Sequence, residues 1–320
     1  MGSYLSSTTT PKTHRALELL IKLTAASLNP FDQKCRDLGL LIADRLPAVL
    51  GGDIVGTVVA VGSDIPASSG FAVGTRVVSQ ATGTPTSAQN GLQEYALADW
   101  PFAVGKVPDG VSDEAAATLP TAIVASLVGI FDALGIPAPW IEDGEAEAEA
   151  EAEAGFDYEG TTLIVVVGGD EEELKGLGAT HVLDRFGGDE AVLGRIREVV
   201  GDELVYAFDT VNYPAGQVLA LNALSGKKKG RLARLLSGKV DGDKVVGKEK
   251  GWELKDVFGS SHAHVELAKG FWERLPGWLE GGEIKTLGYV VKEGLDAEVV
   301  SGVLDAYRDG ERVPKTVVRF

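Results

Sequence analysis

The residues whose chemistry is easiest to interpret are Gly168, Gly169 and Asp170, which follow an unbroken apolar run over residues 163–167. A run made only of leucine and β-branched residues is typical of a strand buried on both faces of a parallel sheet. The glycines allow the chain to turn, and the Asp170 carboxylate could accept hydrogen bonds from the hydroxyls of an adenine ribose, which favours NAD. An ordinary turn between a strand and a helix has the same composition, so both interpretations stay open.

The residues after this turn predict a second strand. Residues 171–177 have helical composition, Gly178 ends that helix, and His181 begins another apolar stretch. A strand, a turn, a helix and a second strand form the building block of a dinucleotide-binding sheet. However, no Gly-x-Gly-x-x-Gly follows the first strand. We therefore expect an oxidoreductase fold whose phosphate-binding corner is altered or missing.

Metal chemistry is not expected. Cys35 is the only cysteine, which excludes an internal disulfide and a multi-cysteine zinc site and fits a reducing compartment. The histidines do not cluster as ligands, and the pair His262 and His264 is a weak signal without a partner sulfur or carboxylate at a known spacing. Cys35 is most simply a partly buried thiol.

The composition of the whole chain argues against several classes of partner. The 320 residues are 44% hydrophobic and carry a net charge of −17, which disfavours nucleic acid and anionic membranes because both attract clustered lysine and arginine. No apolar run reaches the roughly 18 residues of a membrane span, and residues 1–13 lack the apolar core of a secretion signal. We therefore expect a cytoplasmic protein.

The pattern of strands and helices divides the chain in two. Short strands punctuated by glycine up to Pro108 are typical of a small barrel, whereas strands and helices alternate over residues 161–258, as in a parallel sheet. The predicted fold is therefore α/β with two domains. Residues 1–125 form the first, closed by residues 262–320, and residues 126–261 form the second. An acidic Glu-Ala insert at residues 142–155 is expected to be a solvated loop.

With these elements placed, the chain resembles the medium-chain dehydrogenase/reductase superfamily, and within it the zinc-free quinone and enoyl reductases, including fungal proteins described as zinc-binding alcohol dehydrogenase-like. The resemblance covers nearly the whole chain and implies a GroES-like β-barrel substrate domain with a Rossmann-like, doubly wound parallel-sheet cofactor domain. The stretches that carry it are AASLNPFDQK (25–34), GGDIVGTVVAVGSDI (51–65), FAVGTRV (71–77), GLQEYA (91–96), KVPDGVSDEAAATLPTA (106–122), LKGLGATHVLDR (174–185), YAFDTV (206–211) and residues 271–320.

The resemblance also implies site residues. It places Asn29, Asp32 and Thr121 around the cleft between the domains, where Asn29 and Thr121 would polarise a carbonyl or bind the nicotinamide amide. Asn29 and Asp32 are also residue types that cap helices, so a structural role stays open. Arg185 stands at a family position that can face a 2′-phosphate, which favours NADP. The full set implied to bind the cofactor is Gly168, Gly169, Asp170, Arg185, Asp209, Gly259 and Ser260, although the last three would equally suit ordinary strand ends.

Two departures from the family pattern affect the expected function. Gly52 and Asp53 stand where the zinc enzymes have a His-Glu pair, so no zinc is expected. Compared with the family pattern, we expect one βα unit of about 30 residues, which would hold the pyrophosphate, to be missing before residue 168. The resemblance implies an oxidoreductase that transfers a hydride from NADPH or NADH to a small enoyl, quinone or related carbonyl substrate, and it allows a homodimer. The alternative is a non-catalytic relative, a binder or scaffold, that has lost the phosphate-binding loop.

Overall fold

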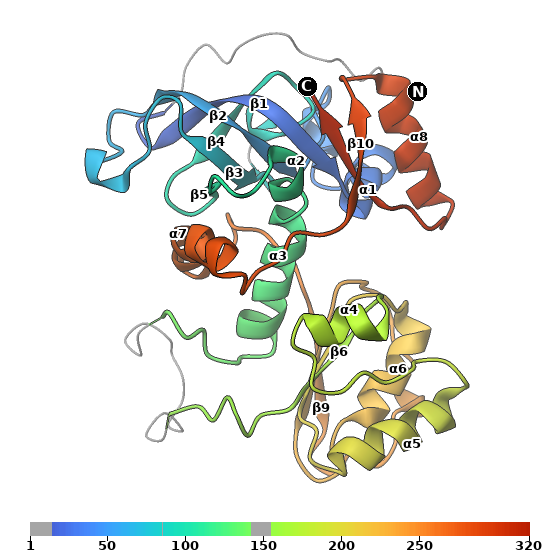
Figure 1. Cartoon of the computed structure of the whole chain (residues 1–320). Helices are drawn as coiled ribbons and strands as arrows, with labels where there is room; N and C mark the ends of the chain where they lie inside the picture. Colours follow the sequence, from blue (N-terminus) through green and yellow to red (C-terminus); the bar gives the residue numbers. More distant parts are fainter. Residues whose placement is uncertain (1–14, 85, 142–154) are drawn as a thin grey trace. The chain divides into compact units, whose positions relative to one another are not determined.

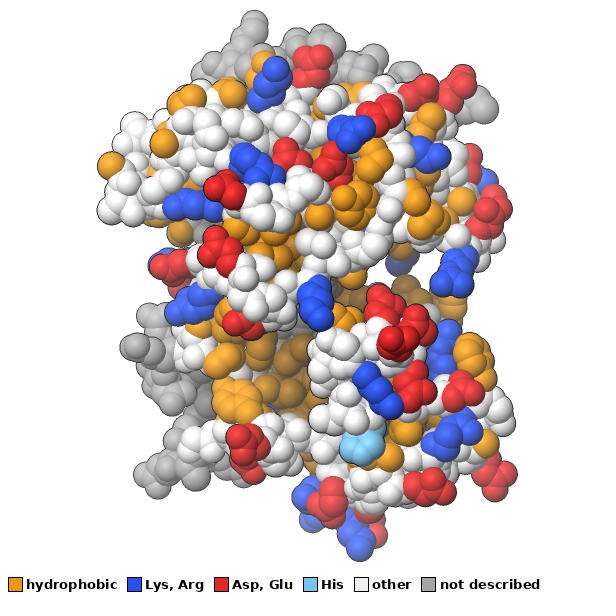
Figure 2. Space-filling model, viewed as in Figure 1, with side chains coloured by type: hydrophobic (Ala, Val, Ile, Leu, Met, Phe, Trp, Pro, Cys, Tyr) orange, Lys and Arg blue, Asp and Glu red, His pale blue; other side chains and the backbone are white. Residues whose placement is uncertain are grey.

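The computed structural model of the chain describes residues 15–84, 86–141 and 155–320 (Figure 1). The chain forms two compact units. The first takes in the described residues up to Val124 together with Gly259–Phe320, and the second is Ala125–Phe258. Nearly all of the Glu-Ala insert lies outside the described residues, as do residues 1–14. On the face shown in Figure 2, basic side chains are scattered among acidic ones.

The first unit is built on a seven-stranded sheet in the order β10-β11-β1-β2-β3-β5, with β4 also paired to β1. Its strands are β1 (Glu18–Leu28), β2 (Asp53–Val61), β3 (Arg76–Gln80), β4 (Tyr95–Asp99), β5 (Val104–Lys106), β10 (Tyr289–Glu293) and β11 (Lys315–Arg319). All pairs are antiparallel except β10 with β11. One edge of the long strand β1 pairs first with β4 and then with β11.

The register of these strands brings three chain segments to one end of the sheet. Ser27 near the end of β1 lies opposite Asp53, the first residue of β2. The next residue, Leu28, lies opposite Thr316, the second residue of β11. Polar residues that are far apart in the sequence therefore lie close together at this end.

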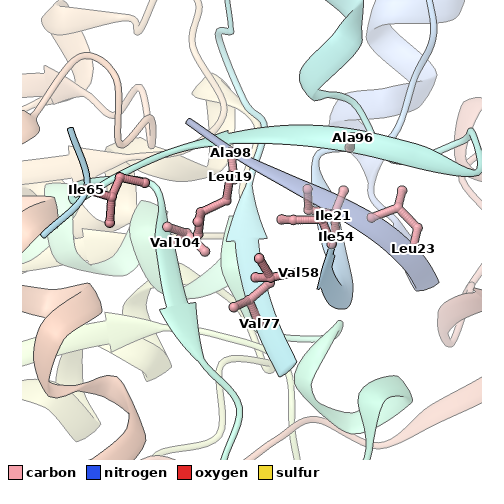
Figure 3. Close-up of a cluster of buried hydrophobic side chains, with 10 residues drawn as sticks. All are labelled: Leu19, Ile21, Leu23, Ile54, Val58, Ile65, Val77, Ala96, Ala98 and Val104. Atoms are coloured by element: carbon pink, nitrogen blue, oxygen red, sulfur yellow. The ribbon is translucent and has the colours of Figure 1, made fainter. Parts of the chain in front are cut away.

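The core of the first unit comes from alternate residues of these strands, because successive side chains of a strand point to opposite faces. Figure 3 shows the cluster, which is composed of Leu19, Ile21, Leu23, Ile54, Val58, Ile65, Val77, Ala96, Ala98 and Val104. Close strand approach also requires Gly56, since a Cβ atom there would lie 2.2 Å from the Lys22 carbonyl oxygen. No side chain fits at that distance.

The helices of the first unit are α1 (Pro30–Leu38), α2 (Asp113–Ala116), α7 (Val265–Gly281) and α8 (Ala297–Arg308), with short 3₁₀ turns η1 (Ala43–Arg45), η2 (Ala67–Ser69) and η3 (Ser87–Gln89). Helix α1 begins at Pro30, whose fixed φ suits a first turn, and ends at Gly39 in the left-handed conformation. Arg36 of α1 forms an ion pair with Asp305 of α8 at 2.7 Å, which joins the two helices.

Helix α3 (Pro120–Leu127) and the π-helical turn η4 (Val128–Ala133) connect the first unit to the second. Together with α2 they form the helical run Asp113–Ala133, the one run among the described residues that is long and apolar enough to cross a membrane. Less than half of its most apolar window, 44%, is buried, and core helices of soluble proteins meet the same criterion. The sequence did not reveal this run because Asp113, Glu114 and Pro120 interrupt its apolar residues.

The second unit has a four-stranded parallel sheet in the order β6-β7-β8-β9. Its elements are β6 (Leu163–Val166), α4 (Glu171–Gly176), α5 (Asp189–Val200), β7 (Tyr206–Asp209), α6 (Pro214–Ala223), β8 (Gly230–Arg234), η5 (Gly242–Lys244) and β9 (Trp252–Asp256). Ala207 and Leu232 pack towards α5 and α6, whereas Phe208 and Ala233 pack on the other face with residues 133–136. Helical segments therefore cover both faces of this sheet.

The predicted α/β fold with two parts is confirmed, but three expectations in the second part need correction. The run at residues 163–167 is not buried on both faces, because β6 lies at the edge of the sheet and Val165 is 42% exposed. Residues 181–183 form no strand. The described strands follow one another across the sheet in chain order, without the reversal that creates the ligand crevice of a doubly wound sheet. The loss of one βα unit stays a prediction.

Candidate functional site

The best-organised polar cluster in the first unit surrounds Asp53, which is fully buried. One oxygen of its carboxylate, Oδ2, accepts hydrogen bonds from Ser27 Oγ at 2.6 Å and Asn29 Nδ2 at 2.8 Å, and pairs with Lys315 Nζ at 2.9 Å. The other oxygen, Oδ1, accepts from the Thr121 backbone N–H at 2.7 Å. We refer to Ser27, Asn29, Asp53, Thr121 and Lys315 as the Asp53 cluster.

The local sequence explains why these residues meet. Ser27 and Asp53 are directly opposite in the β1–β2 pair, and Lys315 begins β11 on the other side of β1. Gly52 precedes Asp53, and a Cβ there would lie 3.0 Å from Thr82 Oγ1 and 3.1 Å from Thr121 Oγ1. A side chain at position 52 would therefore push against both hydroxyl groups, and glycine lets the start of α3 approach β2.

The electrostatics of the cluster keep Asp53 ionised. Burial raises the pKa of Asp53, but the nearby Lys315 ammonium and the hydrogen bonds from Asn29, Ser27 and Thr121 together bring it below its ordinary value. Each of these donors is directed at the charged form of the carboxylate, which favours ionisation. The result is a buried carboxylate matched by one buried ammonium group.

Asn29 is held in a single orientation within this cluster. Its Oδ1 accepts a hydrogen bond from Lys315 Nζ at 2.6 Å, while its Nδ2 donates to Asp53. The side-chain amide of Asn29 and the ammonium group of Lys315 carry more hydrogens than their contacts in the cluster use. Both groups therefore retain further donor capacity. Thr121 Oγ1 lies 3.4 Å from Thr82 Oγ1, and either hydroxyl can donate. Such donors suit the carbonyl oxygen of a substrate.

Asp32 lies behind this cluster and supports the backbone. Its Oδ2 accepts from the Asn29 backbone N–H at 2.8 Å, and its Oδ1 accepts from the Gly51 backbone N–H at 3.0 Å. The pKa of Asp32 is raised to about 6, mainly by burial and further by the negative charge of Asp53. The hydrogen bonds to its carboxylate lower the pKa, but by less. Of the three residues predicted to be catalytic, Asn29 and Thr121 therefore meet at Asp53, whereas Asp32 fixes the start of α1.

The predicted ribose-binding residues lie in an exposed part of the second unit. Gly168, Gly169 and Asp170 follow β6, and Asp170 Oδ1 accepts from the Glu173 backbone N–H at 2.8 Å, which caps α4. Arg185 is exposed and its guanidinium lies over the Phe186 ring, 4.6 Å from the ring centre. These contacts describe a strand-to-helix turn and a surface arginine.

The other predicted cofactor residues are engaged within the protein. Asp209 is fully buried at the end of β7, and its carboxylate accepts from the backbone N–H groups of Val211 and Asn212 at 3.1 and 2.8 Å. Gly259 and Ser260 belong to the first unit. There the Gly259 carbonyl accepts from Gln80 Nε2, and Ser260 Oγ donates to the Thr82 carbonyl, both at 2.8 Å. The predicted set is thus divided between the two units.

The turn after β6 does not fit the diphosphate of a nicotinamide dinucleotide. Such a group is held by backbone N–H groups at the N-terminus of a helix. Helix α4 has only six residues, and its first turn carries Glu171, Glu172 and Glu173, whose carboxylates repel a diphosphate. Asp170 already binds one of the free N–H groups. The described residues of this turn therefore supply no phosphate cradle.

The described residues also contain no group of three or more His, Cys, Asp or Glu side chains that could hold a metal ion. In the Asp53 cluster, the carboxylate that would face a metal is already occupied by Ser27, Asn29 and Lys315. Cys35 is buried, and burial raises the pKa of its thiol to about 12, so a thiolate ligand is disfavoured.

Comparison with known proteins identifies the class of fold. Residues 15–126 match the family described as the alcohol dehydrogenase GroES-like domain. The solved structure of CurK enoyl reductase superposes with a TM-score of 0.68 at 17% identity, covering 99% of this chain and 97% of that one. A mycobacterial quinone oxidoreductase superposes with a TM-score of 0.65 at 21% identity, covering 98% and 94%.

Sequence relatives point in the same direction. Trans-enoyl reductase resD of Aspergillus sclerotiorum is 28% identical over 92% of this chain and 90% of its own length. Trans-enoyl reductase tazE of Aspergillus terreus is 35% identical, but over 38% of this chain and 40% of its own. The family model, these relatives and the solved structures together support the medium-chain dehydrogenase/reductase superfamily for this chain. At the level of that family, the relatives support a nicotinamide-dependent reductase.

Sequence reasoning missed the centre of the cluster. Asp53 was noted only as the residue in place of the acidic member of a zinc-binding pair, and Lys315 and Ser27 were not singled out. Lys315 is 286 positions from Asn29, so no local motif connects them. The available signal was that two strands each begin with a charged residue. Such residues can meet when the two strands pair with opposite edges of the same third strand.

Proposed function

We propose that this protein is a zinc-free reductase that transfers a hydride from NADPH or NADH to an enoyl, quinone or related carbonyl compound. The observation that carries the proposal is the Asp53 cluster, in which Asn29 and Lys315 are fixed as hydrogen-bond donors around a buried carboxylate. The names of the relatives support the substrate class, since resD is a trans-enoyl reductase and one structural relative is a quinone oxidoreductase. A cytoplasmic location fits the single cysteine.

The residues of the cluster suit a reaction in which negative charge develops on a carbonyl oxygen. A nicotinamide cofactor, when bound, would supply the hydride. The remaining donor capacity of Asn29 and Lys315 would bind the carbonyl oxygen and stabilise its growing charge, and the Thr121 hydroxyl would orient the group. The Lys315 side chain is only 11% exposed, so little water competes for its charge. This arrangement needs no metal as Lewis acid.

A second candidate is favoured by a specific observation in the second unit. The turn after β6 lacks a phosphate cradle and leads into three consecutive glutamates. A relative that kept the fold while losing this contact would bind small molecules or act as a scaffold. The two candidates differ in whether NADPH or NADH binds at all.

The first experiment is a thermal shift assay with NADPH and with NADH at increasing concentration. A reductase predicts a melting temperature that rises with at least one of them, because a ligand bound only to the folded state stabilises it. A flat response to both favours the non-catalytic relative. Where binding is seen, oxidation of the cofactor is followed at its absorbance with a panel of enones and quinones.

A pair of variants then connects turnover to the cluster. Thr121→Val removes the hydroxyl but keeps the backbone N–H that binds Asp53. We expect a fall in turnover of roughly tenfold or more, as for the loss of one positioned donor. Thr180→Val alters an exposed threonine of the second unit and is the matched control. Equal activity of both variants would contradict a role for Thr121 in the reaction.

A further inference from the structure

Residues 226–250 of the second unit have a charge balance opposite to that of the whole chain. They contain nine lysine and arginine residues and three aspartate and glutamate residues, although the chain carries a net charge of −17. Five of these cations have a carboxylate partner, namely Lys228, Lys229, Arg231, Arg234 and Lys244. Lys227 and Lys248 instead line one pocket, and a concentration of positive charge of this kind attracts anions.

This pocket lies at the end of the parallel sheet where the strands begin. It has a volume of about 420 Å³, and its lining includes Arg197 of α5 and residues from the segments 222–227 and 246–249, which lead into β8 and β9. The predicted cofactor residues 168–170 and Asp209 stand where β6 and β7 end. Because ligands of open α/β sheets bind at the carboxyl ends of the strands, this pocket is separate from the expected cofactor edge.

The walls of the pocket are fixed by contacts within the protein. A Cβ atom at Gly226 would lie 2.8 Å from the Gly247 carbonyl oxygen, so glycine lets these two segments approach each other closely. The Asn222 side chain ties α6 to the second segment, because its Nδ2 donates to the Lys244 carbonyl and its Oδ1 accepts from the Val246 backbone N–H, both at 3.0 Å. The pocket therefore exists without a ligand to organise it.

Two cations of the pocket share the same partners at the end of α6. Arg197 Nη2 donates to the Asn222 and Leu224 carbonyls, both at 3.1 Å, and Lys248 Nζ donates to the same two groups. A helix C-terminus acts as roughly half a negative charge, and Asp202, 2.7 Å from Arg197, adds one more. The two cations exceed this negative charge. Accordingly, burial and the charge of Arg197 lower the pKa of Lys248, although Asp202 opposes them.

The pocket also keeps hydrogen-bond donors for a ligand. The ammonium group of Lys227 is exposed and forms no ion pair or hydrogen bond within the part of the chain that the structure describes. Lys248 carries three N–H donors and uses two of them on the carbonyls of α6, so one is left. The carboxylates in the lining are Asp202, which already accepts from the Gly226 backbone N–H at 2.8 Å, and Glu249. Three cations against two carboxylates leave the lining positive.

We propose that this pocket binds a small anion that carries two phosphate groups, with Lys227 and Lys248 as its direct contacts and Arg197 adding positive charge behind them. Each ammonium group is a point charge that suits one phosphate group. A volume of about 420 Å³ is in the range of pockets that hold small molecules rather than single ions. The site is independent of whether the protein is a reductase.

The test is isothermal titration calorimetry of the full chain with inorganic pyrophosphate, at an ionic strength held constant with sodium chloride. We expect the wild type to bind, and Lys227→Ala to weaken the affinity by at least roughly fivefold, as for the loss of one charge-assisted contact. The matched control is Lys239→Ala, at an exposed lysine of the same segment that does not line the pocket. Its affinity should equal that of the wild type.

A further variant locates the bound pyrophosphate, since a nicotinamide dinucleotide also contains a diphosphate. Arg185→Ala removes a cation predicted to face the cofactor, and we expect it to leave pyrophosphate binding unchanged. A wild-type chain that binds no pyrophosphate, or an affinity that Lys227→Ala leaves unchanged, would overturn the proposal. An equal loss in Lys239→Ala would do the same, because it would indicate attraction to the whole basic segment. None of these outcomes alters the thermal shift expected with NADPH or NADH.

Discussion

The Lys315 ammonium lies 2.9 Å from Asp53 Oδ2, although the two residues are 262 positions apart in the sequence. This ion pair joins the start of β11 to the start of β2 across the end of β1. Asp53 is fully buried and the Lys315 side chain is 11% exposed, so each charge depends on the other for its compensation. Removing either partner leaves the other in a place from which water is nearly excluded.

Lys315→Met is therefore expected to destabilise the protein strongly. The substitution keeps the apolar stem but leaves the Asp53 carboxylate buried without a cation, a change that typically costs about 3–5 kcal/mol. Denaturant unfolding of the first unit measures the loss. Lys315→Arg retains the charge and should lose less.

The double variant Asp53→Asn with Lys315→Met separates the ion pair from general packing. Once both charges are absent, the second substitution should cost less than it does alone, giving a coupling of about 1–3 kcal/mol. Strictly additive losses would mean that the two groups do not stabilise each other.

Asp32 should make stability fall as the pH rises through the weakly acidic range. Burial and the charge of Asp53 raise its pKa from 3.8 to about 6. Between these values the folded chain holds a proton that the unfolded chain has lost, so the free energy of unfolding decreases as pH rises. The free energy of unfolding of wild type relative to that of Asp32→Asn should fall by about 2 kcal/mol from pH 4 to pH 6, and level off above about pH 7.

Asp53 provides a contrast of opposite sign. Its pKa is lowered in the folded state, so its contribution is present above the ordinary aspartate pKa and is lost as the pH falls through the folded value. Unfolding measured for Asp53→Asn across the same pH range distinguishes the two carboxylates.

The Asp32 prediction has its own contrary outcome. If the free energies of unfolding of wild type and Asp32→Asn change in parallel between pH 4 and pH 6, the pKa of Asp32 is not raised by folding.

These residues show what the sequence could and could not predict. The alternation of strands and helices over residues 161–258 predicted the parallel sheet that the structure contains. The apolar run at residues 163–167 predicted a strand correctly but not its place at the sheet edge. Burial depends on which strands lie on both sides, and this information is not local.

The candidate site was predictable in part for the same reason. Asn29 and Asp32 stand at a turn with a recognisable composition, and both contribute to the Asp53 region. Lys315 could be found only from the antiparallel register that places β11 beside β1. The residues 181–183 formed no strand although their types favour one, since local residue types alone do not determine where a strand forms.

Asp209→Ala tests whether this predicted cofactor residue has a structural role. The carboxylate accepts three hydrogen bonds from residues 211 and 212, and their loss leaves buried donors without an acceptor. We expect a loss of about 2–3 kcal/mol in the free energy of unfolding of the second unit. Asp241→Ala, at an exposed aspartate, should change it by less than about 0.5 kcal/mol. Equal stability of the two variants would mean that the hydrogen bonds of Asp209 do not stabilise the second unit.

Gly56→Ala tests the strand pairing on which the Asp53 cluster depends. The new methyl group would lie 2.2 Å from the Lys22 carbonyl oxygen and 2.9 Å from the Leu23 Cα atom, and backbone atoms cannot move aside as a flexible side chain can. The β1 and β2 strands must separate, so we expect a loss of about 3 kcal/mol in unfolding experiments. Gly110→Ala, where no atom lies within 4 Å of the new Cβ, should change stability by less than about 1 kcal/mol.

The same variant connects the fold to the site. Ser27 and Asp53 belong to the β1–β2 pair that Gly56 allows to close, and their hydrogen bond of 2.6 Å requires that pairing. If the strands separate, the Asp53 carboxylate loses the Ser27 contact, and any cofactor oxidation that depends on the cluster should fall together with stability. A Gly56→Ala protein as stable as Gly110→Ala would show that β1 and β2 lie further apart, and the contacts of Asp53 with Ser27 and Asn29 would then need revision.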